Sequence, residues 1–182
     1  MRDKDFYNAV KNDIVLPQFL ETYASREFVE VIQGRQFTMG SQYYRYDQFS
    51  CVVEGSVDFY FVHPIYRQEV YADQQTDSLL RNEHSTDAGL PDDFQPFEET
   101  KSPVNFGKPD LEAYPNFEFS GAESQTLHPG DCIYIPALTW VQVQAQPRFG
   151  KNLSNIIVNA VYGPSSSMLL ALMSAVEHRI IK

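Results

Sequence analysis

The sequence has little histidine, cysteine or tryptophan: its 182 residues include 4 His, 2 Cys and 1 Trp. The two cysteines, Cys51 and Cys132, are too few for a disulfide framework and lack the spacing of a metal site. They fall in predicted core strands, where a cysteine most often acts as a small buried hydrophobe. We therefore expect a reducing intracellular compartment, cytoplasmic by default, with a mitochondrial complex as an open alternative.

Basic residues are also scarce, with 14 Lys and Arg against 24 Asp and Glu, for a formal net charge of −10. A nucleic acid or an anionic lipid surface requires a basic stripe, so we expect neither as a partner. No apolar run reaches the length of a membrane span, and the N-terminal residues resemble neither a secretory signal nor a transit peptide. Aromatic residues, in contrast, reach 14%, with 11 Tyr and 13 Phe, which favours strands.

Short apolar or alternating segments, separated by Gly and Pro turns, predict most of the secondary structure. Gly55 and Ser56 separate two such segments and predict a β-hairpin. Pro129 and Gly130 predict a second turn. Many short strands joined in this way are typical of a β-sandwich or barrel. The predicted strands cover residues 49–54, 57–62, 117–119, 124–127, 132–135, 140–145 and 155–162.

Both ends of the single domain predicted for residues 1–182 are expected to be helical. The parts are a helical lead-in (1–36), a first β block (37–71), an acidic loop (72–105), a second β block (106–163) and a C-terminal helix (164–182). That helix is apolar on more than one face, so we expect it to pack on a second copy, on a protein partner or on its own barrel. The contact residues would be Met168, Leu169, Leu172, Met173 and Val176. The acidic loop is either a solvated insertion or a docking element for a basic partner.

Four blocks of sequence carry a resemblance that covers nearly the whole chain. They are Ile14–Leu20, Tyr46–Gly55, Ser102–Pro115 and the run from Leu127 through Pro136 to Trp140. In this order they resemble the cupin-like, JmjC-type domains. The resemblance implies a mainly β fold, the double-stranded β-helix or jelly roll, with flanking N- and C-terminal helices.

The resemblance also implies where a metal would be bound. Active members of the family are Fe(II)/2-oxoglutarate oxygenases that hold iron with two His and one carboxylate. In this chain the corresponding positions are Gln42, Tyr44 and Val141, and the lysine that pairs with 2-oxoglutarate corresponds to Val57. We therefore predict a pseudoenzyme without metal or cofactor. It would be a non-catalytic structural or protein-interaction module, as an accessory subunit of a larger, possibly organellar, complex.

Two alternatives stay open. The first is an Fe(II)/2-oxoglutarate hydroxylase with displaced ligands, which would depend on His63 or His128. The second is a metal-free cupin that binds a small neutral molecule, with Gln42 and Asn159 as hydrogen-bonding groups and Trp140 in the pocket lining. A competing interpretation of the pocket is that Tyr44 and neighbouring aromatic side chains fill the position of the family's metal site. The pocket would then be part of the hydrophobic core.

Overall fold

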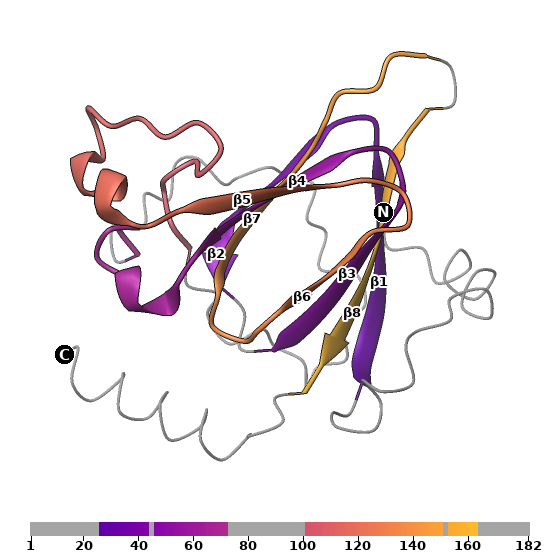
Figure 1. Cartoon of the computed structure of the whole chain (residues 1–182), viewed down its shortest axis with the longest axis horizontal. Coiled ribbons are helices and arrows are strands. Elements are labelled where there is room, and N and C mark those ends of the chain that lie inside the picture. Colours follow the sequence, from indigo (N-terminus) through magenta and orange to yellow (C-terminus); the bar gives the residue numbers. More distant parts are fainter. Residues whose placement is uncertain (1–25, 44–45, 73–100, 151–152, 164–182) are drawn as a thin grey trace.

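Two antiparallel four-stranded sheets face each other in the protein, as Figure 1 shows. The structure is a computed structural model that describes residues 26–43, 46–72, 101–150 and 153–163. One sheet has the strand order β1-β8-β3-β6 and the other β2-β7-β4-β5. The strands are β1 (Arg26–Gly34), β2 (Phe37–Tyr43), β3 (Asp47–Glu54), β4 (Val57–Val62), β5 (Glu123–Leu127), β6 (Cys132–Ile135), β7 (Trp140–Ala145) and β8 (Asn155–Tyr162).

The order of the strands confirms the predicted jelly roll. Apart from β4 to β5, each connection along the chain carries it from one sheet to the other. Gly55 takes a φ of 97° in the β3–β4 turn and Gly130 a φ of 95° in the β5–β6 turn. Both values are readily adopted by glycine alone, which explains why these two predicted turns form where they do. The β-hairpin predicted across Gly55 is wrong, because β3 pairs with β6 and β8 while β4 pairs with β5 and β7 in the other sheet.

The lead-in, residues 1–36, was predicted to be helical. This prediction is wrong for its last part, because β1 occupies Arg26–Gly34. Val29 and Val31 alternate with Glu30 and Ile32, and β-branched residues at a period of two favour a strand. The remaining helical predictions, for residues 1–25 and 164–182, lie outside the described residues. Most of the acidic loop, residues 73–100, does so too.

Two short 3₁₀ helices complete the described elements, η1 (Pro64–Tyr66) and η2 (Pro115–Phe119). The strand predicted at residues 117–119 is therefore wrong. Pro115 stands at the start of η2, where its fixed φ favours a helical turn and its missing N–H costs nothing. None of the helices in the part of the chain that the structure describes is long and apolar enough to cross a membrane.

An inner cluster of apolar side chains fills the space between the sheets. Alternate residues of each strand point inward. Burial of each large aliphatic or aromatic side chain stabilises the fold by roughly 1.5–3 kcal/mol. The members of the inner cluster are Val52, Val57, Phe59, Leu127, Ile135, Val141, Val143, Ala145 and Ile157.

An outer cluster covers the opposite face of the β2-β7-β4-β5 sheet. Gln142 holds the covering segment there, because its side-chain Oε1 accepts from the backbone N–H groups of Phe106 and Gly107. Ser102 adds a second tie, donating its hydroxyl to the carbonyl oxygen of Val70 at 2.6 Å. The members of the outer cluster are Tyr43, Val62, Val70, Ala72, Val104, Phe106, Phe117 and Trp140.

Cys51 and Cys132 form a disulfide, contrary to the prediction that they are unpaired buried hydrophobes. They lie directly opposite each other on β3 and β6, with their Cα atoms 4.1 Å apart. Cys132 is exposed and Cys51 is partly buried. The pairing spans 81 residues of sequence, so spacing alone could not reveal it.

Candidate functional site

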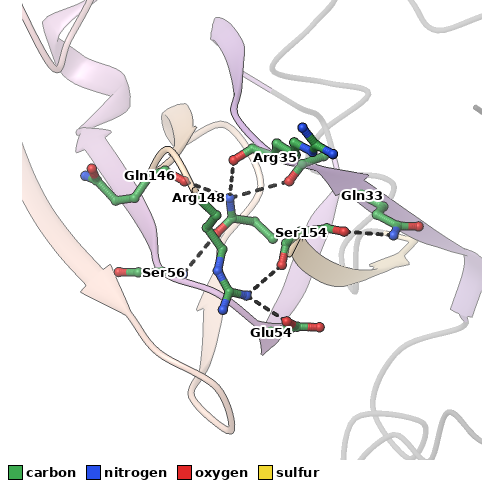
Figure 2. Close-up of polar contacts among 9 residues, drawn as sticks. Gln33, Arg35, Glu54, Ser56, Gln146, Arg148 and Ser154 are labelled. Carbon is green, nitrogen blue, oxygen red and sulfur yellow. Dashed lines mark hydrogen bonds and ion pairs between the residues drawn. The ribbon is translucent and has the colours of Figure 1, made fainter. Parts of the chain in front are cut away.

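At one end of the barrel, which we call the closed end, the fully buried side chain of Asn155 holds the connections between strands together. Its Nδ2 donates to the carbonyl oxygens of Gly34 at 3.4 Å, Arg35 at 2.9 Å and Gln146 at 2.8 Å. Its Oδ1 accepts from the backbone N–H of Ser56 at 3.1 Å. Figure 2 shows Arg35, Ser56 and Gln146 close together at this end of the barrel. Asn155 therefore joins three connections between strands, and these four hydrogen bonds of its side chain all go to backbone groups.

The turn beside Asn155 is packed too tightly for a side chain. A Cβ at Gly55 would overlap Oδ1 of Asn155, and the positive φ of Gly55 would strain any other residue. Arg148 braces the same end, pairing with Glu54 at 2.8 Å and donating to the carbonyl oxygen of Ser154 at 2.8 Å (Figure 2). This end is built for rigidity, and it leaves no room for a ligand at the amide.

Farther along β8, a group of polar side chains lies on the inner face of the β1-β8-β3-β6 sheet. We define the polar layer as Gln48, Ser50 and Asn159. Ser50 pairs with Asn159 across β3 and β8, and Gln48 occupies the next inward position of β3. The next pair toward the closed end is Val52 and Ile157, both members of the inner cluster. The polar layer therefore stands directly on the apolar core.

Hydrogen bonds link the three side chains of the polar layer to one another. The Ser50 hydroxyl donates to Oδ1 of Asn159 at 2.9 Å. Nδ2 of Asn159 donates to Oε1 of Gln48 at 3.4 Å. The exposed fraction is only 3% for Ser50, 7% for Asn159 and 5% for Gln48. The amides have more donor hydrogens than these two bonds use, so the layer has capacity to bind a further acceptor.

Two more side chains share the inward face near this layer. Glu30 of β1 lies opposite Asn159, and Gln42 of β2 lies opposite Val141 of β7. Directly opposite residues of paired strands share a face of the sheet. Glu30 and Gln42 are both partly buried. The interior at this level therefore combines neutral amides and a hydroxyl with one carboxylate.

The side chains at the positions that the resemblance predicts for the iron ligands do not fit a two-histidine, one-carboxylate site. Val141 has no ligand atom, and it belongs to the inner cluster. Gln42 opposite it offers only a neutral amide. Tyr44 lies outside the described residues. Among residues 26–43, 46–72, 101–150 and 153–163, no group of three or more His, Cys, Asp or Glu could hold a metal ion.

The two histidines of the displaced-ligand alternative cannot share a metal. His63 follows β4 and its Nδ1 accepts from the backbone N–H of Ile65, capping η1. His128 follows β5, in the turn where its backbone N–H donates to Asp131. Because β4 and β5 are antiparallel, these positions lie at opposite ends of the pair, seven residues or roughly 23 Å apart by strand rise.

The other two predicted pocket residues, Val57 and Trp140, lie on opposite faces of the β2-β7-β4-β5 sheet. Val57 is fully buried at the start of β4 and belongs to the inner cluster, so it cannot pair with a carboxylate. Trp140 points to the opposite face and packs edge-to-face on Tyr43, with ring centroids 4.8 Å apart. Its predicted place in the pocket lining is corrected, because neighbours in a strand face opposite ways and Val141 takes the inner side.

Sequence reasoning missed Gln48 and Ser50 as members of the site. Their signal is their parity on β3: both alternate in step with buried Val52, so they must point inward. Asn159, the predicted hydrogen-bonding residue, is in the polar layer. Gln42 is on the same inward face, opposite Val141.

The groups with shifted pKa values lie on the outer faces. Burial raises the pKa of Tyr134, and the nearby Asp47 carboxylate, which accepts a hydrogen bond, raises it further. Burial, followed by the charge of Asp58, raises the pKa of Tyr60. Asp58 also accepts from the Thr126 hydroxyl at 2.7 Å and from the side-chain amide of Gln146. These carboxylates serve the outside of the barrel and not its interior.

Comparison with solved structures returns proteins of related architecture. One is the hydroquinone 1,2-dioxygenase from Sphingomonas sp. TTNP3 with 4-hydroxybenzoate bound, with 10% identity and a TM-score of 0.39 over 75% of this chain and 59% of that chain. Another is E. coli ycfD, with 12% identity and a TM-score of 0.41 over 86% of this chain and 29% of that chain. The chain thus spans less than two thirds of either protein. No curated protein matches the sequence.

The family comparison covers most of the chain, since residues 4–168 match the model of the cupin-like domain. This match contradicts the prediction that the chain is not an enzyme, because the resemblance links the family to active oxygenases. The absence of ligand atoms at one set of positions does not establish the absence of activity. On the extent of the match and the jelly-roll order of its strands, the chain belongs to the cupin-like domain family.

Proposed function

We propose that the polar layer binds a small, uncharged polar molecule inside the barrel. The observation that carries this proposal is the hydrogen-bonded set of Ser50, Asn159 and Gln48 on the inner face of the β1-β8-β3-β6 sheet. Buried polar side chains cost free energy unless they are paired, and an apolar core of the same shape would fold at least as well. Three of them together support a binding role.

The chemistry of the layer defines the class of ligand. Side-chain amides offer N–H donors to a carbonyl or hydroxyl oxygen, and Ser50 offers lone pairs to a donor. Val141 supplies an apolar surface on the facing strand. An anion is disfavoured, because Glu30 shares this face and a buried charge without a counterion is costly. The best fit is a neutral molecule with a hydrogen-bonding edge and an apolar body.

A ligand screen with matched variants tests the proposal. A panel of small neutral carbonyl and hydroxyl compounds is screened by thermal shift, and affinities of the retained compounds are measured by calorimetry. Ser50→Ala and Asn159→Ala should each weaken binding about tenfold or more, which is about 1.4 kcal/mol. Ser102→Ala is the control, because its buried hydroxyl serves the outer cluster and its loss should leave affinity within about twofold.

Two results would overturn the binding role. One is that the panel yields no compound that binds the wild-type chain. The other is that Asn159→Ala binds a retained compound as tightly as wild type does, since the amide would then make no contact with the ligand.

As a second candidate function, we propose that the domain is a protein-interaction module within a larger complex. The observation in favour is a set of large apolar side chains left in solvent: Phe149 at 89%, Ile65 at 75% and Phe119 at 70% exposed. Large apolar side chains in solvent offer anchors for a partner, and aromatic residues such as Phe are enriched at protein interfaces. The other segments proposed for contact with a partner or a second copy, residues 73–100 of the acidic loop and the C-terminal segment 164–182, lie outside the described residues.

Native size separation of a gentle lysate tests this second candidate. A chain that works in an assembly should migrate far above a dimer of 20.9 kDa subunits. Phe149→Ser should shift it toward the free chain, whereas Leu111→Ser is the control at a less exposed position. A wild-type chain that migrates as a monomer or dimer would contradict the accessory role.

A further inference from the structure

We propose that the Cys51–Cys132 disulfide is a redox-sensitive lock that holds strand β6 against β3. A small thiol would open the lock, free β6 and loosen the polar layer, and an oxidant would restore it. The effect on the layer rests on the proposed binding function, whereas the release of β6 does not.

The geometry makes β6 unusually dependent on this bond. β6 has four residues and lies at the edge of its sheet, paired within that sheet with β3 alone. Its ladder consists of Ile135, Tyr134, Ile133 and Cys132, opposite Gln48 to Cys51. Beyond Cys132, backbone bonds between Val52 and the β5–β6 turn continue the contact. A short edge strand has few hydrogen bonds of its own, so one covalent link contributes a large share of its stability.

Access to the bond is open from solvent. Cys132 is exposed, and so are all four residues of the preceding turn, His128 to Asp131. Exposed disulfides are the ones that exchange with thiols, whereas bonds inside a core are protected. A low-molecular-weight thiol of the glutathione type can therefore reach the sulfur atom of Cys132.

The exchange is balanced by two equivalents of thiol. The first thiolate attacks Sγ of Cys132, forms a mixed disulfide and expels Cys51 as a thiolate. A second thiolate attacks the sulfur of the bound small thiol, releases Cys132 and leaves as the oxidised dimer. Two electrons pass from the small thiols to the protein, and the two cysteine thiolates take up protons. An oxidised small-molecule disulfide reverses both steps.

Opening the disulfide would affect the polar layer through Ser50, the residue before Cys51. Ser50 precedes Cys51 and pairs with Ile133, which follows Cys132. Its hydroxyl donates to Oδ1 of Asn159. Loss of the β6 ladder removes the partner that fixes the backbone of Ser50 on one side. The hydroxyl then holds the Asn159 amide less firmly, which weakens the arrangement that would receive a ligand.

Hydrogen exchange of the full chain, read by mass spectrometry, tests the lock directly. In dithiothreitol, amides of Cys132–Ile135 should exchange about tenfold faster than in oxidising buffer, while those of β8 change by less than about twofold. Oxidised glutathione should restore the slow rate. The Cys51→Ser/Cys132→Ser variant should exchange at the fast rate in both buffers and ignore dithiothreitol, which separates the loss of this bond from other effects of the reductant.

Three outcomes would overturn parts of the inference in distinguishable ways. Two titratable thiols in oxidising buffer would show that the bond does not form, and equal exchange of β6 in both buffers would show that it does not lock the strand. If β6 is released but a retained panel compound binds equally in both buffers, the coupling to the polar layer is wrong. If the panel yields no ligand, the proposed function fails and hydrogen exchange still decides the lock.

Discussion

The two halves of the barrel interior each bury an asparagine of β8, and they use it differently. Asn155 is fully buried and bonds backbone groups of three connections. Asn159 is 7% exposed and bonds the side chains of Ser50 and Gln48. The two residues lie on the same strand and face the same interior.

The partners decide what each amide can do. Backbone groups at the closed end cannot leave Asn155 without unfolding a turn, so that amide is committed to structure. Side chains can change rotamer and share their hydrogen bonds with a ligand, so Asn159 remains able to recognise one. Under the proposed function, the same residue type on one strand is thus a fold determinant at one position and a recognition group at another.

The largest expected effect is at the closed end. Asn155→Ala removes four hydrogen bonds that tie three connections together, and it leaves a cavity where the fully buried amide stood. The free energy of unfolding should fall by about 3–5 kcal/mol. Urea denaturation followed by tryptophan fluorescence measures it. A loss below about 1 kcal/mol would contradict the claim that the Asn155 amide is a major determinant of the fold.

A third buried amide, Gln142, sharpens the comparison because it also bonds backbone groups but on the outer face. Gln142→Ala should release the segment around Phe106 and lower the free energy of unfolding by about 2 kcal/mol. Hydrogen exchange of residues 104–107 should rise with it. Ligand affinity at the polar layer should not change, and a matched loss of affinity would show that the two faces are coupled.

A smaller effect on stability is expected at the polar layer. Asn159→Ala should cost about 1 kcal/mol, because Ser50 and Gln48 can turn toward each other or toward water. The same urea experiment applies, with Asn155→Ala run beside it. If Asn159→Ala is as damaging as Asn155→Ala, the layer is part of the structural core and the difference between the two halves disappears.

The smallest effect concerns the outside of the barrel. Burial, followed by the Asp47 carboxylate, raises the folded-state pKa of Tyr134 above its usual value of 10.0. The protonated phenol is therefore favoured in the fold, and its contribution to stability is complete below pH 10.0 and lost as the pH rises through the folded-state pKa. Since Tyr134 is half exposed, this contribution is small.

An ultraviolet titration of tyrosinate checks the origin of this shift. Asp47→Asn should lower the pKa of Tyr134 toward its usual value and leave Tyr60 unchanged, because Tyr60 responds to Asp58. If Asp47→Asn lowered the pKa of both tyrosines, the charge of Asp47 would act from one sheet to the other through the barrel interior.

Much of the fold could be predicted because its signals are local. Gly55 and Gly130 mark their turns, and the alternation of residues 140–145 gives β7. The strand β1 was missed because its short alternating run follows a segment with helical spacing. Such a run belongs to a strand only when a partner such as β8 pairs with it.

The site was harder to predict because its roles depend on contacts distant in sequence. A family pattern could place Gln42 and Val141, but Trp140 was placed by adjacency although its side chain takes the opposite face. Ser50 and Asn159 are 109 residues apart, and no local pattern distinguishes Asn159 from Asn155. The Cys51–Cys132 pair was hidden for the same reason.

The most direct test of the account is to observe the side-chain amides themselves. Nuclear magnetic resonance of the isotope-labelled chain resolves the amide signals of Asn155 and Asn159 during titration with a compound retained from the neutral panel. The account predicts that the Asn159 and Gln48 signals move with ligand concentration while the Asn155 signal stays in place. Movement of Asn155 with Asn159 unchanged, or movement of neither, would contradict it.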